Sequence, residues 1–215
     1  MDDIASTFKV AEHAAIEMAE NLESNDHSLT IPAANNVRAH CKSFSQKADH
    51  FAISLKKIVD LFYPQMRGRN WTDFPELIEA EYGKSDNFSK VLEVATPALV
   101  LIRNMRDCLE HNLTGITTWD FELQPDGSIA PPTIEINFRQ SVQSRCSISK
   151  LMEDITQAMP IYFEMFVAHM CSKSIQPFAG MPLTVGMLSD DLQKAWRVRF
   201  AYGAYYQDDN FVPCG

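Results

Sequence analysis

Residues 37–62 carry the longest unbroken hydrophobic pattern in the chain. The apolar residues recur at alternating spacings of four and three, which places them on one face of an α-helix. These residues are Val37, Cys41, Phe44, Ala48, Phe51, Leu55, Ile58 and Phe62. Residues 2–23 repeat the spacing on Ile4, Phe8, Ala11, Ala15, Met18 and Leu22. A turn predicted at residues 25–28 separates the two segments, so we expect an antiparallel helix hairpin.

Three more helices follow from the same reasoning. A short helix is expected over residues 75–82, where Gly83 ends it. A third long helix runs from Ser85 or Asp86 to about Asn112, and a fourth from about Ser147 to Lys173. The buried face of the fourth helix is expected to include Ile148, Leu151, Ile155, Ala158, Tyr162, Met165 and His169.

Residues 116–139 change to a period of two, which is typical of strands. Apolar residues alternate with polar ones on both sides of a turn sequence at residues 125–128. We therefore expect a two-stranded β-hairpin, whose second strand is an edge because Pro131 and Pro132 precede it. Residues 198–202 also alternate, within an otherwise irregular C-terminal segment.

The predicted fold is mainly α. It is an antiparallel bundle of about four long helices plus one short helix, with a small β-hairpin insertion and an irregular or β-structured C-terminal extension. Residues 1–175 are expected to form one helical domain with the hairpin at about 116–139. Residues 176–215 are expected to pack on this bundle as an extension.

Charge and cysteine usage limit the classes of function. The formal net charge of −9 repels nucleic acid overall, so any RNA binding requires a local basic patch. The five cysteines are scattered, with no CxxC pair, which argues against a disulfide framework and a zinc site. The acidic residues after Met1 do not resemble a secretory signal. We expect a cytoplasmic protein with no membrane association, no metal and no cofactor.

The third long helix carries the most informative residues. Its last turns place the charged residues on the arc opposite an apolar one. The charged residues are Arg103, Arg106, Asp107, Glu110 and His111. Arginine offers paired donors to phosphate oxygens, and histidine transfers protons near neutral pH. Arg106 and His111 are therefore candidate catalytic residues for metal-independent RNA cleavage. Arg103, Asn104, Asp107 and Glu110 are candidate substrate-binding residues around them.

A second interpretation of the same residues needs no catalysis. Arg103 and Asp107 are four residues apart, as are Arg106 and Glu110, so both pairs suit ion pairing along a helix. His111 near a helix C-terminus is also favoured by the helix dipole. In this interpretation the charged face is solvated or contacts a partner protein.

The segment from Arg106 to His111 resembles the motif of the HEPN superfamily, an arginine followed by a polar residue and then a histidine after four to six intervening residues. The resemblance covers roughly residues 1–112 and 147–173. It implies a dimeric helical bundle in which the motifs of two protomers meet as a metal-independent ribonuclease site. Other members bind nucleotides, or serve as inactive partners in toxin–antitoxin or defence systems.

Several functions remain open on the sequence. The resemblance predicts a homodimer that acts as an endoribonuclease or binds a nucleotide, with a cognate protein partner in a toxin–antitoxin or defence setting. The alternative is a catalytically inactive helical protein–protein interaction module. A third alternative is regulatory binding of a small molecule, which an apolar pocket away from the charged face would favour. A di-iron bundle is not supported, because the chain has no Glu-x-x-His.

Overall fold

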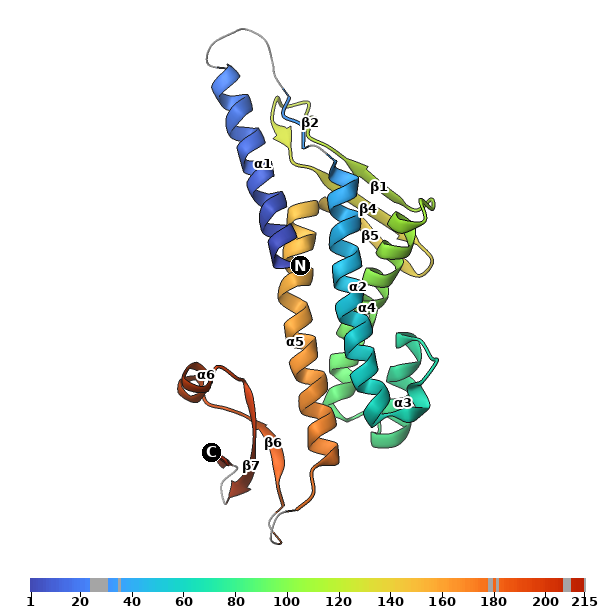
Figure 1. Ribbon diagram of the computed structural model, residues 1–215, viewed down its shortest axis with the longest axis vertical. Helices are drawn as coiled ribbons and strands as arrows, with labels where there is room; N and C mark the ends of the chain where they lie inside the picture. Colours follow the sequence, from blue (N-terminus) through green and yellow to red (C-terminus); the bar gives the residue numbers. More distant parts are fainter. Residues whose placement is uncertain (24–30, 35, 178–179, 181, 207–209, 215) are drawn as a thin grey trace. The chain divides into compact units, whose positions relative to one another are not determined.

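The computed structural model describes residues 1–23, 31–34, 36–177, 180, 182–206 and 210–214. The chain forms two compact units that alternate along the sequence: Met1–Ser54 with Val94–Met159, and Leu55–Glu93 with Pro160–Gly215. Three long helices contribute to both units, namely α2 (Val37–Phe62), α4 (Asn87–Glu110) and α5 (Ile148–Ser174) (Figure 1). Packing of residues 176–215 as an extension on a domain formed by residues 1–175 stays a prediction.

The predicted fold class is wrong. All the predicted helices are present, as α1 (Asp2–Glu23), α2, α3 (Phe74–Tyr82), α4 and α5. Helices account for 61% of the described residues, but three small antiparallel sheets accompany them. The fold is therefore mixed, with helices and sheets, and is not a clean four-helix bundle. The hydrophobic periodicity found the long helices, whereas most of the additional strands are too short or too polar to show a period.

The apolar face of α2 drifts away from the predicted positions. Val37, Cys41, Phe44, Ala48 and Leu55 are buried as expected. Further along, Ala52 and Val59 are buried, whereas their predicted neighbours Phe51 and Ile58 are only half-buried. An α-helix of 3.6 residues per turn drifts by about 20° per heptad against a 3.5-residue repeat. The core face of α2 therefore moves on by one residue in its second half.

The buried face of α1 also differs from the face that the sequence predicted. Among its described side chains, Phe8, Glu12 and Ala19 are buried, whereas Ala11 and Met18 from the predicted face are exposed. The turn predicted at residues 25–28 and the side chain of Leu22 lie outside the described residues. Contacts from α1 to two other helices place it in the first unit. The Phe8 ring lies 5.7 Å from the His40 ring of α2, and Lys9 pairs with Glu153 of α5 at 3.7 Å.

The first unit contains more β-structure than the predicted hairpin. Strand β4 (Thr133–Phe138) lies between β1 (Ile116–Trp119) and β5 (Ser141–Ser147) in a three-stranded antiparallel sheet. Strands β2 (Glu122–Leu123) and β3 (Ile129–Ala130) form a separate hairpin around the predicted turn. The expectation that β4 is an edge strand is thus wrong, because the two prolines precede it and leave its own N–H groups free to pair.

Strand β5 has a polar sequence that hid it from the periodicity. Its exposed face includes Val142, and only Ser141 is buried among its seven residues. The strand forms because it continues from β4 through a tight turn, where Arg139 adopts a left-handed conformation with φ 53°. This turn brings residues 139–141 against α4, as the polar contacts described below show.

The second unit is built around aromatic side chains. Phe166 of α5 packs edge-on against Trp71 and Phe88, with ring centroids 5.8 and 5.0 Å apart. His169, one turn further along α5, stacks on Phe88 at 3.9 Å. Tyr63, between α2 and the 3₁₀ helix η1 (Pro64–Met66), brings its hydroxyl within 3.0 Å of His169 Nε2. A second 3₁₀ helix, η2 (Trp71–Asp73), precedes α3. His169 was correctly predicted on the buried face.

The C-terminal part of the second unit is regular. Strand β7 (Phe200–Tyr206) pairs on one side with β6 (Thr184–Met187) and on the other with β8 (Asn210–Pro213). A short helix, α6 (Asp190–Trp196), connects β6 to β7. Only the alternation around residues 198–202 signalled this sheet. In the described parts of the chain, no helix combines the length and hydropathy needed to cross a bilayer.

Candidate functional site

The charged face of α4 lies in the first unit and is held by an ordered helix end. Asn112 follows the helix in a left-handed conformation with φ 51°, and the Leu113 N–H donates to the Cys108 carbonyl oxygen at 3.0 Å. This bond and the left-handed residue form a Schellman-type cap. His111 therefore lies at the last half-helical position, where its backbone N–H still donates to Asp107 and its side chain is exposed.

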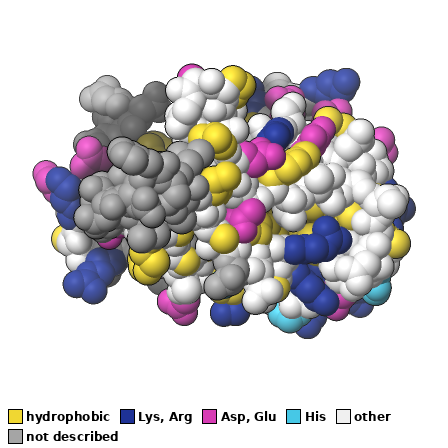
Figure 2. Space-filling model, turned by 90° about the horizontal axis from the view of Figure 1, so that it is seen from above, with side chains coloured by type: hydrophobic (Ala, Val, Ile, Leu, Met, Phe, Trp, Pro, Cys, Tyr) yellow, Lys and Arg dark blue, Asp and Glu magenta, His cyan; other side chains and the backbone are white. Residues whose placement is uncertain are grey.

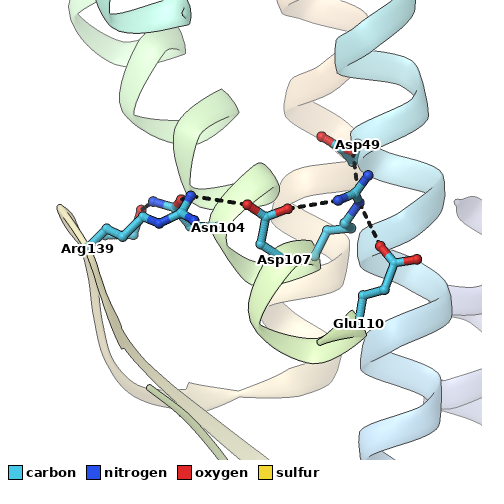
Figure 3. Close-up of polar contacts among 7 residues, drawn as sticks. Asp49, Asn104, Asp107, Glu110 and Arg139 are labelled. Carbon is cyan, nitrogen blue, oxygen red and sulfur yellow. Dashed lines mark hydrogen bonds and ion pairs between the residues drawn. The ribbon is translucent and has the colours of Figure 1, made fainter. Parts of the chain in front are cut away.

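Arg106 is held by three carboxylates. Its Nη1 lies 2.8 Å from Asp107 Oδ1, and its Nε lies 3.0 Å from Glu110 Oε2 and 3.3 Å from Asp49 Oδ2. Asp107 and Glu110 are on α4 itself, whereas Asp49 comes from α2. Figure 3 shows Asp49, Asp107 and Glu110 arranged around one guanidinium group. The predicted ion pair between Arg106 and Glu110 is confirmed.

Asp49 is the most buried member of this cluster, with its side chain 5% exposed. Burial raises the pKa of Asp49 above its ordinary value, and the positive charges of Arg106 and Arg103 oppose that rise. A buried carboxylate without a cation is costly, so the charge of Arg106 offsets the burial of Asp49. The arginine of the predicted motif thus connects α4 to α2.

A second arginine completes the cluster on the other side. Arg139, from the turn between β4 and β5, places Nη1 3.1 Å from Asp107 Oδ2 and donates a hydrogen bond of 3.3 Å to Asn104 Oδ1. Asp107 therefore lies between two guanidinium groups (Figure 3). Asn104 is buried and donates to Ser141 Oγ at 2.8 Å. These contacts join the sheet to α4.

The predicted site residues therefore separate into two groups. Arg106, Asp107, Glu110 and Asn104 take part in one network, which also includes Asp49, Arg139 and Ser141. Arg103 and His111 are exposed and belong to neither an ion pair nor a side-chain hydrogen bond within the described residues. The expected ion pair between Arg103 and Asp107 does not form, because Asp107 is already shared by Arg106 and Arg139.

Asp49 and Arg139 were not predicted as site residues. Asp49 immediately follows Ala48 of the hydrophobic face. An acidic residue beside a buried face is a feature of the sequence that could have identified Asp49 as a site residue. Arg139 carried no such signal, because the sequence placed it at the end of a strand and the adjoining strand β5 was missed. Its position depends on the turn geometry.

The electrostatics of this network differ from those of a phosphate-binding site. The network contains two arginines (Arg106 and Arg139) and three carboxylates (Asp49, Asp107 and Glu110), a formal charge of −1, which the exposed Arg103 on the same face brings to zero. On the face drawn in Figure 2, acidic and basic side chains are likewise interspersed among hydrophobic ones. In the described parts of the chain, no group of three or more His, Cys, Asp and Glu side chains is placed to hold a metal ion.

No protein-family model matches this sequence, and no curated protein or solved structure is significantly similar to it. The resemblance of the Arg106–His111 segment to the HEPN motif therefore stays a prediction.

Proposed function

We propose that this chain is a HEPN-like protein–protein interaction module in which the charged face of α4 serves assembly, with a second copy of the chain as its partner. One observation carries this proposal. The guanidinium of Arg106, the arginine of the HEPN-like motif and the phosphate ligand that the sequence predicted, is already surrounded by Asp49, Asp107 and Glu110.

A phosphate would have to compete with these carboxylates for Arg106. It would also approach a cluster whose charges cancel, on a chain with a net charge of −9. Nucleic-acid binding depends on an excess of positive charge, because affinity comes largely from release of phosphate counterions. A face on which both signs are present instead suits a partner with complementary charges.

Arg103 and His111 supply the exposed part of this face. On α4, Arg103 precedes Arg106 by one turn, and His111 lies at the helix end. A two-fold axis beside α4 would place Arg103 of one copy near the acidic residues of the other, since an isologous interface brings the same patch of both copies together. The homodimer expected from the sequence is thus part of the proposal.

A ribonuclease is the second candidate, and the exposure of Arg103 and His111 favours it. Neither side chain has a carboxylate partner among the described residues, so both are accessible to a phosphate. In a dimer, two such pairs would meet without any involvement of Arg106. This candidate predicts cleavage that needs His111 and Arg103.

The first measurement tests assembly, and a second one separates the two candidates. Sedimentation of the parent should show a dimer. Arg103→Glu should shift the equilibrium toward the monomer. The control Lys47→Glu reverses an exposed charge on α2 and should leave the dimer intact. A parent that is monomeric at tens of micromolar would refute the assembly proposal.

The second measurement is cleavage of a mixed single-stranded RNA in EDTA by the parent, His111→Ala and Arg103→Ala, with circular dichroism confirming that all three fold. We expect no cleavage by the parent. Cleavage that disappears in both variants would establish the ribonuclease and overturn the interaction module.

A further inference from the structure

An apolar cavity lies in the second unit, and none of its lining residues belongs to the charged face of α4. It has a volume of about 310 Å³ and is formed by one face of α5, strand β6 and the chain leading into β7. Its apolar lining includes Phe163, Val167, Ala168, Val185, Phe200 and Tyr202. Ligand pockets in proteins begin at about 300 Å³ and are mostly apolar with a few polar groups, so this cavity has the size of a small-ligand site.

The volume sets the size of the ligand. A dry apolar cavity of about 150 Å³ accommodates one benzene ring. A cavity of about 310 Å³ therefore accommodates roughly twice as many carbon atoms, on the order of a dozen. This matches a medium-length alkyl chain.

Among the described residues, polar groups line the cavity at two places. Cys171 and Tyr202 lie beside each other at the first. Arg199 forms an ion pair with Glu164, and both side chains line the cavity. Arg199 and Glu164 lie on the side of the apolar cavity that adjoins a second, more polar cavity.

The adjoining cavity of about 320 Å³ shares Glu164, Val198 and Arg199 with the first. It is also lined by Asp190, Gln193, Lys194 and Arg197. Because Arg199 is paired with Glu164, the remaining charges are those of Lys194, Arg197 and Asp190, which sum to +1. Neither Lys194 nor Arg197 has an ion-pair partner among the described residues, and both are exposed.

We propose that these two adjoining cavities bind a small amphipathic anion, with an alkyl chain of about a dozen carbons between α5 and β7 and a carboxylate beside Lys194 and Arg197. The apolar part is favoured by removal of its surface from water, at about 0.8 kcal/mol for each buried methylene. The cations favour a negatively charged head over a neutral or positive one. This site is independent of the proposed role of α4.

The test is calorimetric titration of the full chain with decanoate below its micellar concentration, compared with decanol. We expect saturable binding of one decanoate, and weaker binding of decanol. The double variant Lys194→Gln with Arg197→Asn should weaken decanoate binding roughly 4- to 25-fold, since each exposed charge contributes about 2- to 5-fold. Asparagine suits position 197, where the backbone is left-handed with φ 55°.

Two further variants separate the cavity from other surfaces. Val167→Trp fills the apolar cavity and should abolish decanoate binding, whereas Val94→Trp, at an exposed position of α4, should leave it unchanged. Lys90→Gln, an exposed lysine outside both cavities, is the charge control. Absence of decanoate binding by the parent, equal binding of decanol, or unchanged binding by folded Val167→Trp would overturn the proposal.

Discussion

His169 should make the second unit lose stability in mild acid. Burial lowers the pKa of His169 from 6.5 to about 4, with Asp86 acting in the opposite direction and Lys173 in the same direction. The unfolded chain therefore binds a proton at this histidine from about pH 6.5 downward, whereas the folded chain binds it only near pH 4. The unfolded state binds more protons in this window, so the free energy of unfolding falls as the pH falls.

The geometry explains why the ring stays neutral. It stacks on Phe88 at 3.9 Å and lies 3.0 Å from the Tyr63 hydroxyl through Nε2. Asp86 lies 4.0 Å from Nδ1, but its carboxylate also forms an ion pair of 2.8 Å with Lys173. Glu81 accepts a hydrogen bond from the Tyr82 hydroxyl and acts electrostatically on Tyr63. The carboxylate of Asp86 is already neutralised by Lys173, so it compensates little for the loss of water around a charged imidazole.

The shift sets the approximate size of the effect. Each pKa unit corresponds to about 1.4 kcal/mol, so His169 alone should lower the free energy of unfolding by about 1 kcal/mol at pH 5.5 and by about 3 kcal/mol at pH 4.5, relative to pH 8. Asp86 affects the free energy of unfolding at lower pH than His169 does. Burial raises its pKa, but the hydrogen bonds from Lys173 and the Phe88 N–H outweigh burial and hold it below 3.8. The stabilisation that Asp86 supplies is therefore lost only below about pH 4.

The assay is urea unfolding at pH 8, 6.5, 5.5 and 4.5, followed by circular dichroism. His169→Gln keeps a polar side chain beside Tyr63 but does not titrate, so the free energy of unfolding should change less with pH by the amounts above. His111→Gln removes an exposed histidine and should keep the pH dependence of the parent. If the parent and His169→Gln show the same pH dependence within about 0.5 kcal/mol, the burial argument is refuted.

Three other predictions concern packing, reactivity and backbone strain. Phe166→Ala should reduce the free energy of unfolding by about 3–5 kcal/mol in urea, because Phe166 is fully buried among aromatic rings; a loss below about 1 kcal/mol would contradict this. A thiol reagent at pH 8 should label exposed Cys214 and leave Cys41 unlabelled by peptide mass spectrometry, since burial raises the pKa of Cys41 to about 12. Gly115→Ala should lower the melting temperature more than Gly68→Ala. Both glycines have positive φ, but only at Gly115 would the new Cβ lie 2.7 Å from a carbonyl oxygen of β4.

The sequence predicted the helices well because long amphipathic helices have a strong periodic signal. Helix α1 has the predicted bounds, and α4 and α5 differ from their predicted ends by a residue or two. The sheets were harder to predict, because strand pairing is non-local. Strand β5 pairs with β4 although its own sequence is largely polar, and β8 completes the C-terminal sheet with only four residues.

In the candidate site, too, the sequence could not predict contacts between residues that are far apart along the chain. The sequence could place Arg106, Asp107 and Glu110 together because all three share one face of one helix. It could not place Asp49 or Arg139, which come from α2 and from the turn after β4. Both residues affect how the motif is interpreted. Asp49 supplies a third carboxylate to Arg106, and Arg139 pairs with the second carboxylate oxygen of Asp107.

An arginine and a histidine at this spacing are therefore compatible with a catalytic role or with a structural one. The residues that surround them in the fold favour one role over the other. If Asp49 were absent, Arg106 would retain two carboxylates from its own helix, both on side chains more exposed than that of Asp49. The third carboxylate is nearly buried, so releasing Arg106 to a phosphate would leave a buried charge without its partner. That cost, several kcal/mol for a buried pair that loses one member, favours the proposal that Arg106 is structural and that the exposed Arg103 and His111 contact a partner.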